Sequence, residues 1–252
     1  MNDSKFRWQA AAIHLCASAV TAAVAVWIAL RIWYPSPYFE ALDGRRLIAL
    51  IVGIHVILGP LITLIVFDAK KKKSLLKLDL AAIVVLQLAA LAYGVHIAYQ
   101  ARPAYLLFVK DRFEIVTANQ LEPEQLAKAS RPEFGTVPFS GPITAAADLP
   151  TDAKELEFLQ KIAIGTGADV QLFPQYFVPY PERRELVLSK AKSLELFALE
   201  LPLSKLVIER ALAAAGRKPA EVLILPLYIN KRDLAVIVGA ADAAVIAVVM
   251  IE

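Results

Sequence analysis

The chain has 252 residues, of which 58% are hydrophobic, and its formal net charge at neutral pH is +3. Soluble domains are usually about 45–50% apolar, and the mean hydropathy of this chain is high at +0.55. The basic excess lies in one short loop and is not spread over a face, which excludes a nucleic-acid footprint. Cys16 is the one cysteine, so the chain can form no internal disulfide.

Three apolar segments dominate the first hundred residues, at 8–33, 47–67 and 80–99. Each has the roughly 20 residues that a bilayer-spanning helix requires. The first segment is longer than the hydrophobic part of a signal peptide, which spans about 7–15 residues, and two further apolar segments follow it. The sequence therefore predicts three transmembrane helices, the first of them retained.

A lysine-rich loop at 68–79 separates the second and third apolar segments. Lys and Arg resist translocation, so this loop is predicted to be cytoplasmic. Seven basic residues flank the apolar segments on the side of this loop, against four on the other side. The N-terminus is then cytoplasmic, and the loop at 34–44 and everything after residue 100 lie outside. The lysines that set this topology are Lys70, Lys71, Lys72, Lys73 and Lys77.

A short segment with two prolines follows the first apolar segment. The prolines fix the backbone and prevent the helix from continuing. Two interpretations are open, a turn anchored at the membrane boundary or a docking surface for another membrane helix. The candidate contact residues are Trp33, Tyr34, Pro35, Tyr38 and Phe39.

The second apolar segment is interrupted by Gly53, Gly59 and Pro60. Small residues allow helices to approach closely, and a proline frees a backbone carbonyl inside the span. His55 lies about one turn before the proline, and an ionisable residue in a span is a functional candidate. We favour the simpler interpretation, a neutral His55 hydrogen-bonded to a freed carbonyl or to Gln87. His14 and His96 lie at other depths, so a shared metal or proton site is not expected.

Residues 101–252 are long enough for one modest core and are predicted to form a second domain. Expected helices lie at 123–130, 151–164, 182–198 and 202–215, and a loop at 131–150. Expected strands lie at 104–109, 113–118, 221–228, 233–238 and 244–251, with hairpin turns at 230–233 and 240–243. The economical arrangement is an antiparallel sheet of about five strands with helices on one face. The predicted fold class is thus membrane α+β: a three-helix module at 1–100, then an exported α+β domain at 101–252.

The segment at 171–181 carries three prolines and four aromatic residues. It is predicted to be either a lid over the core or a contact surface. Its candidate contact residues are Tyr176, Phe177 and Tyr180.

The second domain has no histidine or cysteine and no phosphate-binding loop, so no metal site of His/Cys type, His-assisted nucleophile or cofactor is expected. Its carboxylates are scattered, and acids at helix starts are explained by the helix dipole. The rival interpretation is a membrane-tethered periplasmic enzyme of carboxylate-based chemistry. The acids concerned are Asp148, Asp152, Glu155, Glu157 and Glu182. A small transporter or signalling anchor is a third interpretation, disfavoured because the spans contain no acidic residue.

Several stretches, densest between residues 33 and 118, carry a resemblance to a known family. They are WYPSPYF at 33–39, LGPLITLIVF at 58–67, LQLAALAYG at 86–94, YQARP at 99–103, DRF at 111–113 and LPL at 225–227. In this order and spacing they resemble the type IV pilin accessory proteins of the TfpX/TfpZ kind. That family usually has an aspartate where this chain has His55, so the resemblance assigns no charge-based role there. Family members also tend to continue to a terminal Pro-Trp, which suggests that this chain is trimmed at Glu252.

The resemblance implies an accessory, chaperone-like factor of the bacterial inner membrane, multi-pass, with its C-terminal domain in the periplasm. The implied partner is a major type IV pilin, together with the lipid bilayer and other pilus assembly components. No enzymatic activity and no nucleic-acid partner are expected. The apolar N-terminal helix of a pilin would lie against the Gly53–Pro60 face and the segment at 33–39, and its head against Tyr176 to Tyr180.

Overall fold

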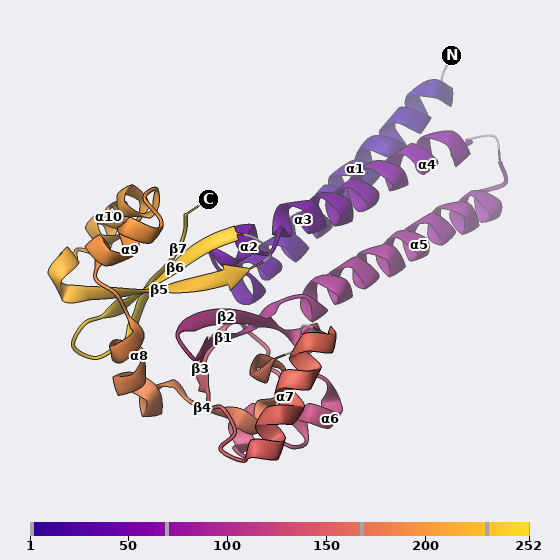
Figure 1. Cartoon of the computed structure of the whole chain (residues 1–252). Helices are drawn as coiled ribbons and strands as arrows, with labels where there is room; N and C mark the ends of the chain where they lie inside the picture. The colour runs from indigo at the N-terminus through magenta and orange to yellow at the C-terminus, as the bar shows by residue number, and fades with distance from the viewer. Residues whose placement is uncertain (1–2, 69–70, 167–168, 230–231, 252) are drawn as a thin grey trace. The chain divides into compact units, whose positions relative to one another are not determined.

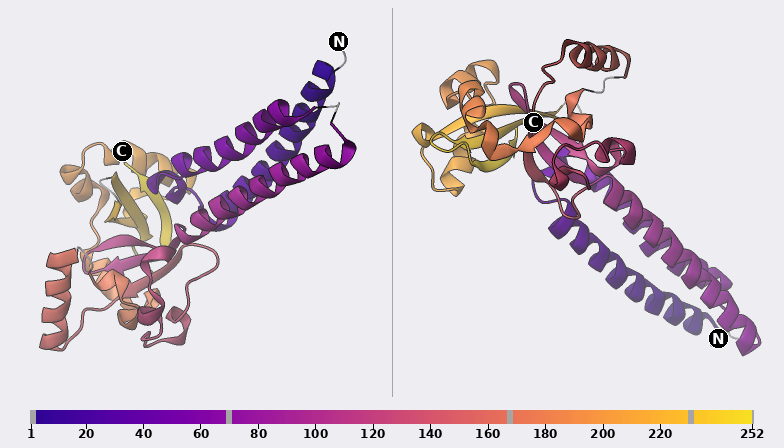
Figure 2. Two further views of the ribbon diagram at one scale, coloured as in Figure 1. Left: turned by 90° about the vertical axis from the view of Figure 1, so that its right-hand side faces the viewer. Right: turned by 90° about the horizontal axis from the view of Figure 1, so that it is seen from below.

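The computed structural model describes residues 3–68, 71–166, 169–229 and 232–251. Its first part contains three long helices that run side by side (Figures 1 and 2). The first joins α1 (Asp3–Ile28) to a π turn, η1 (Ala29–Trp33). The second joins α3 (Gly44–Gly53), the π turn η2 (Ile54–Leu58) and α4 (Gly59–Val66), and the third is α5 (Lys73–Gln100).

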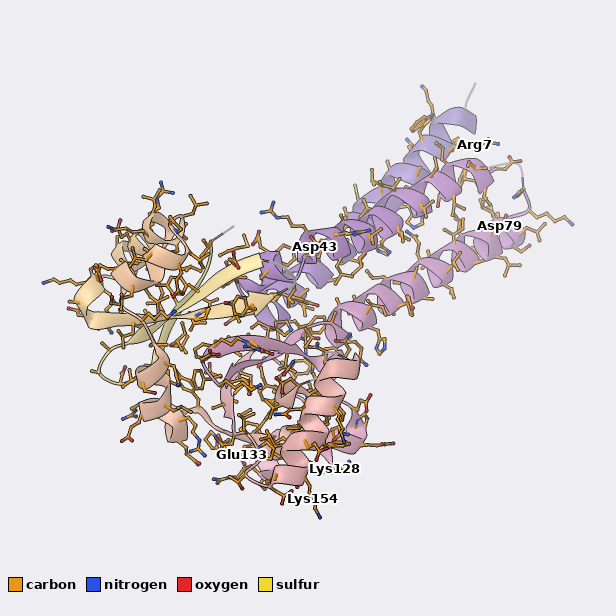
Figure 3. All side chains as sticks on the ribbon, viewed as in Figure 1. Arg7, Asp43, Asp79, Lys128, Glu133 and Lys154 are labelled. Carbon is orange, nitrogen blue, oxygen red and sulfur yellow. The ribbon has the colours of Figure 1, made fainter. Side chains whose placement is uncertain are left out.

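All three helices are long and apolar enough to cross a membrane, over Lys5–Trp33, Gly44–Val66 and Lys73–Gln100. Charged residues lie at the ends of these spans. Figure 3 labels Arg7 and Asp79 at one end of the three-helix part and Asp43 at the other. The three helices predicted from the apolar segments are confirmed, each a few residues longer than its apolar run.

The chain divides into two compact units, and the division does not follow the sequence order. The first unit contains residues 3–34 and 43–101, which are the three long helices. The second contains everything from Arg102 onward together with residues 35–42, which include the short helix α2 (Tyr38–Ala41). A segment between two apolar helices is therefore part of the second unit.

The second unit is built on one seven-stranded sheet with the strand order β4-β3-β1-β2-β5-β6-β7. The strands are β1 (Pro103–Val109), β2 (Arg112–Thr117), β3 (Ile143–Ala147), β4 (Phe177–Pro179), β5 (Val222–Ile229), β6 (Arg232–Gly239) and β7 (Val245–Met250). The pairs β1/β3 and β2/β5 are parallel and the other pairs antiparallel.

The prediction of an antiparallel sheet of about five strands is therefore wrong, although all five expected strands exist. Strand β3 lies in the segment expected to be a loop, and β4 lies in the aromatic segment. The sequence of β3, ITAAA, does not alternate between apolar and polar residues. Its Ala145 and Ala146 are both fully buried, in a strand that lies between β1 and β4, so neither position requires a polar residue. Small residues at such positions leave no strand signal that a polar and apolar pattern could reveal.

Helices cover both faces of the sheet, and not one face as expected. On one face a central core joins Leu106, Phe113, Leu225 and Val236 to residues of α2 and α8 (Arg184–Lys190). The other face carries two separate cores. One packs α7 (Ala153–Thr166) and neighbouring short turns on β1 and β3, and the other packs α9 (Leu194–Glu200) and α10 (Ser204–Ala214) on β5 and β6.

Most helices follow the prediction, with three differences. The helix expected at 123–130 is shorter, α6 (Pro123–Leu126). The helix expected at 182–198 is interrupted, because Lys192 leaves the helix and exchanges backbone hydrogen bonds with Ile224. Helix α7 continues through Gly165 to Thr166, whereas α10 stops before Gly216, whose φ of 64° favours glycine. The turn predicted at 230–233 includes residues 230–231, which lie outside the described residues.

Candidate functional site

A π turn lies directly before Pro60 in the second long helix, over Ile54–Leu58. In a π turn each N–H bonds to the carbonyl five residues earlier. Pro60 has no N–H, so it cannot donate the π-type bond to the carbonyl of His55, five residues earlier. The side-chain amide of Gln87, on α5, donates to that carbonyl at 2.6 Å. The interruption predicted at the proline is thus compensated by a neighbouring helix, as a membrane interior requires.

Gln87 is the centre of a polar cluster that joins all three long helices. Its amide also donates to Ser18 Oγ at 3.3 Å, and its carbonyl oxygen bonds to His14 Nε2. Because that oxygen can only accept, His14 Nε2 is the donor. A neutral His14 then accepts at Nδ1 from Thr63 Oγ1, which lies 2.6 Å away. These groups form a connected network in otherwise apolar surroundings.

The ring of His55 belongs to the same cluster. Its Nε2 lies 2.7 Å from Thr21 Oγ1, and that hydroxyl also lies within 3.0–3.2 Å of two backbone carbonyls of its own helix. His55 is 4% exposed, and its Nδ1 is buried with no hydrogen-bond partner among the described residues. The ring of His55 was expected to bond to a freed carbonyl or to Gln87, but it contacts Thr21, and Gln87 bonds to the backbone carbonyl of His55.

His96 is exposed on α5 and does not take part in the network. Among the residues that the structure describes, no group of three or more His, Cys, Asp or Glu side chains could hold a metal ion. Ser18, Thr21 and Thr63 also belong to this cluster and were not predicted. The signal was available, because His14, Ser18 and Thr21 recur at the spacing of one helix face.

The two glycines of the second long helix are not equivalent. A Cβ built on Gly59 would overlap the side-chain amide of Gln87. A Cβ built on Gly53 would meet nothing within 4 Å. Gly59 is therefore required for α5 to bring Gln87 to the His55 carbonyl, whereas Gly53 leaves open space beside its helix. Pro60 is buried next to Gly59.

Two apolar grooves follow the second long helix, one on each side. The α1–α4 groove has a volume of about 470 Å³, and its lining includes Ala11, Ala12, Ile57, Pro60 and Leu61. The α4–α5 groove has a volume of about 340 Å³, and Gly59 and Gln87 contribute to its wall. Alanine and glycine in such walls permit the close approach of another helix. Ile57 and Leu61 remain 64% and 48% exposed, so a second apolar surface could cover them.

The residues predicted at 33–39 divide between the two units. Trp33 packs edge-to-face on Tyr99 with ring centroids 5.2 Å apart, and Tyr34 donates to the Ala98 carbonyl at 2.8 Å. Tyr38 is buried in the central core of the second unit, where loss of solvent raises the pKa of its hydroxyl. Pro35 and Phe39 are half-buried. The aromatic residues of this segment thus have structural contacts of their own.

The three aromatic residues predicted near 176–180 also differ in exposure. Phe177 is 1% exposed and packs edge-to-face on Tyr105 and Phe134. Tyr180 is buried, and its hydroxyl donates to the Ala243 carbonyl at 2.7 Å. Tyr176 is half-buried and lines a pocket of about 280 Å³ between α6, α7 and the turns before β4. Only Tyr176 offers much of its ring to the surface.

The carboxylates considered for catalysis have structural partners. Asp148 forms a two-pronged ion pair with Arg183 and so raises the pKa of that guanidinium. Asp152 accepts from the backbone N–H groups at the start of α7. Glu155 accepts from the Tyr176 hydroxyl at 3.3 Å. The remaining two also form ion pairs, Glu157 with Lys161 and Glu182 with Arg131.

The lysines of the predicted topology signal lie before and at the start of α5. Lys71 Nζ is 2.8 Å from Asp79 Oδ2, and Lys72, Lys73 and Lys77 are exposed. Lys70 lies outside the described residues. An exposed pair of this kind contributes about 0–1 kcal/mol, so these lysines do little to hold the helices together.

Comparison with known proteins adds independent information. The family model for fimbrial assembly protein FimB matches residues 2–43. The chain is 30% identical over 235 residues to the serogroup I fimbrial assembly protein of Dichelobacter nodosus, covering 92% of this chain and 90% of that protein. It is equally similar to the serogroup E1 protein over 234 residues, with the same shares covered.

A third relative, the fimbrial assembly protein of serogroups C1 and C2 of the same organism, is 32% identical over 131 residues, 51% of this chain and all of the relative. No solved structure matches the chain. The names of these relatives indicate assembly proteins and not enzymes. With nine-tenths of the serogroup I and E1 relatives matched, the chain belongs to the fimbrial assembly protein family.

Proposed function

We propose that this chain is an inner-membrane accessory factor that holds a type IV pilin subunit, in a chaperone-like manner, before or during its assembly into pili. The observation that carries the proposal is the similarity to fimbrial assembly proteins over 92% of the chain. Three apolar helices with open grooves give such a factor a surface inside the bilayer. The second unit gives it a surface outside.

The proposed orientation places the N-terminus and the lysine-rich loop in the cytoplasm and the second unit in the periplasm. The exposed lysines before α5 support the first placement. The composition of the second unit supports the rest, because residues 35–42 and 102–252 form one compact body. Two spans separate these segments, and two spans return a chain to the same side of a membrane.

The proposed occupant of the α1–α4 groove is the apolar helix of a major pilin. Inside a bilayer, helices associate through close packing at small residues and not through the hydrophobic effect. Ala11, Ala12 and Pro60 provide a shallow wall, and Ile57 and Leu61 provide exposed apolar contacts. A lipid acyl chain is the competing occupant, and crosslinking distinguishes the two.

Deletion of the gene is the first test. Surface pili should fall well below the wild-type amount, and pilin should be degraded or retained in the inner membrane. Complementation with the wild-type chain controls for effects on neighbouring genes. Unchanged amounts of both surface pili and membrane pilin would refute the proposal.

Site-specific photocrosslinking tests the groove. A crosslinker at Ile57 or Leu61 should label pilin several-fold more strongly than one at Val20. Val20 is the matched control because it lies on α1, is 64% exposed and does not line either groove. Labelling at Ile57 no stronger than at Val20, with lipid adducts at both, would exclude the groove as the pilin contact. Crosslinkers at Gly53 and Phe39 test the other proposed helix contacts in the same experiment.

The proposed contact with the pilin head is the pocket beside Tyr176. Its lining combines aromatic rings with the amides of Gln120, Gln125 and Gln175, which suits a peptide surface. Phe177 and Tyr180 would act only by holding this region in place, because both are buried. A crosslinker at Tyr176 should label pilin, whereas one at exposed Leu199 on α9 should not. Equal labelling at both positions would count against the pocket.

A further inference from the structure

The two edge strands of the sheet in the second unit differ sharply. The edge at β4 is three residues long and ends in a proline. The backbone N–H of Asp148 donates to the Tyr176 carbonyl, so the backbone groups of Phe177 and Pro179 point away from β3 toward the open edge. Pro179 has no N–H to offer there. A short edge strand with an outward proline is a known protection against pairing with another strand.

The edge at β7 has no such protection. The backbone N–H of Ile251 donates to the Asp233 carbonyl at 2.8 Å. Along an antiparallel strand, residues whose backbone groups bond to the neighbouring strand alternate with residues whose backbone groups point away from it. Since Leu234 faces Met250 and Val236 faces Val248, the backbone groups of Val248 and Met250 point away from β6. Among the residues that the structure describes, no hydrogen bond reaches these outward groups.

The side chains of β7 are apolar on both faces of the sheet. The six residues, VIAVVM, include no charge and no proline, and all six are half-buried. Val248 and Met250 pack on the central core, and Ala247 and Val249 pack on the core beneath α9 and α10. The strand is thus fixed in place, and only its outer backbone and a smaller part of each side chain remain uncovered.

We propose that β7 is a dimerisation edge, on which β7 of a second copy of this chain pairs antiparallel. A strand added here must be apolar on both faces, because it would cover half-buried side chains on both. The added strand must also have an unpaired edge. Of the two described edge strands of this chain, β4 and β7, only β7 is apolar on both faces and has such an edge. A two-fold interface brings the same surface of both copies together, and an uncharged strand pairs with its own copy without repulsion.

A single strand pair buries less surface than the roughly 1,200 Å² of the smaller stable interfaces between soluble proteins. Attachment to one membrane compensates, because it raises the effective concentration of one copy for another. This inference concerns the chain's own assembly and does not depend on the proposed pilin contact. Pairing of the two β7 strands would join the sheets of two second units into one continuous sheet.

The register that pairs both outward residues of β7, Val248 and Met250, with those of the second copy can be tested by cysteine chemistry. Outward Val248 lies opposite Met250 of the second copy, which places Val249 opposite its own copy in a non-hydrogen-bonded pair. Cα atoms in such pairs are about 4.5 Å apart, which a disulfide accommodates. In full-length chain in native membranes, with Cys16→Ser as background, Val249→Cys should form a reducible dimer on mild oxidation. Tyr228→Cys is the control, because Tyr228 is more exposed but lies on β5, away from the edge.

A second pair of variants distinguishes the contribution of the backbone N–H to dimer formation from that of the side chain. Val248→Pro removes the outward N–H without touching the ladder to β6, whereas Val248→Ala shortens the side chain and keeps the N–H. Added to Val249→Cys, the proline should lower the dimer yield roughly tenfold or more, because each dimer loses two hydrogen bonds. The alanine should change the yield by less than about threefold. Protease resistance equal to that of the parent confirms that both variants are folded.

Dimer formation by Val249→Cys no faster than by Tyr228→Cys would overturn the proposal. So would a Val249→Cys adduct with pilin in place of a second copy, because the edge would then serve a different chain. Co-expression of two differently tagged copies identifies the adduct. Pilus counts in the same strains keep the two proposals apart: missing dimers with normal pili refute only this one.

Discussion

Replacing Gly59 by alanine tests the polar cluster that joins the three long helices. The added Cβ would overlap the side-chain amide of Gln87 and displace it from the His55 carbonyl. Gln87 would then lose its bonds to Ser18 and His14 as well. Interhelical hydrogen bonds in membranes contribute about 0.6 kcal/mol each on average and up to about 1.7. We therefore expect Gly59→Ala to lower the free energy of unfolding by about 1–3 kcal/mol.

The matched control is Gly53→Ala on the same helix, because a Cβ there meets nothing within 4 Å. We expect its free energy of unfolding to lie within about 0.5 kcal/mol of the wild-type value or slightly above it, since alanine favours the helix. Unfolding of the full chain in mixed micelles by titration with sodium dodecyl sulfate measures both variants.

Gln87→Ala completes a double-mutant cycle with Gly59→Ala. Once the amide is absent, the alanine at 59 has nothing to displace, so the second substitution should cost far less than it does alone. Equal stability of Gly59→Ala and Gly53→Ala would refute the reasoning. Full additivity in the cycle would do so too, because it would mean that Gly59 and Gln87 act independently.

Three further predictions concern the second unit. Burial opposes ionisation of Asp169, but bonds from Lys110 and the Val170 N–H and nearby positive charge outweigh it and lower its pKa. Asp169 therefore stabilises the fold above about pH 4 and loses this effect as pH falls further, so Asp169→Asn should flatten an acid melting profile measured by circular dichroism. Tyr180→Phe leaves the Ala243 carbonyl unpaired and should cost about 1–2 kcal/mol in denaturant unfolding; no loss would contradict the burial of that bond. Burial raises the pKa of Tyr105 to about 12, so stability should fall from about pH 10 upward, and Tyr105→Phe should weaken that fall in the same melting assay.

The sequence predicted well what depends on long apolar runs or on local turn chemistry. The three long helices follow from length and composition, and the end of α10 follows from Gly216. The β1/β2 and β5/β6/β7 hairpins follow from apolar β-prone runs separated by short turn segments. In each case the signal and the structure involve residues close together in the chain.

What the sequence did not predict depends on partners far apart in the chain. Strand β3 is alanine-rich and forms because β1 and β4 supply its hydrogen bonds. The polar cluster was only partly predicted: Pro60 suggested a freed carbonyl and Gln87 a partner, but a single sequence does not place Thr21 and Thr63 at the same depth. The burial of Phe177 and Tyr180 likewise arises from strands that approach from elsewhere.

In the proposed membrane topology, the segment at 35–42 links the folding of the second unit to the insertion of the helices. Tyr38 and Ala41 are part of its central core, together with Leu234 and Val236. Between them and Arg102 the chain passes through the second and third long helices. In the proposed topology, the core can therefore close only after both helices have inserted and the chain has returned to the side where residue 42 left it. In that topology, a hairpin inserted the wrong way would leave Tyr38 and Ala41 apart from the core that they cover, and its apolar surface would remain exposed.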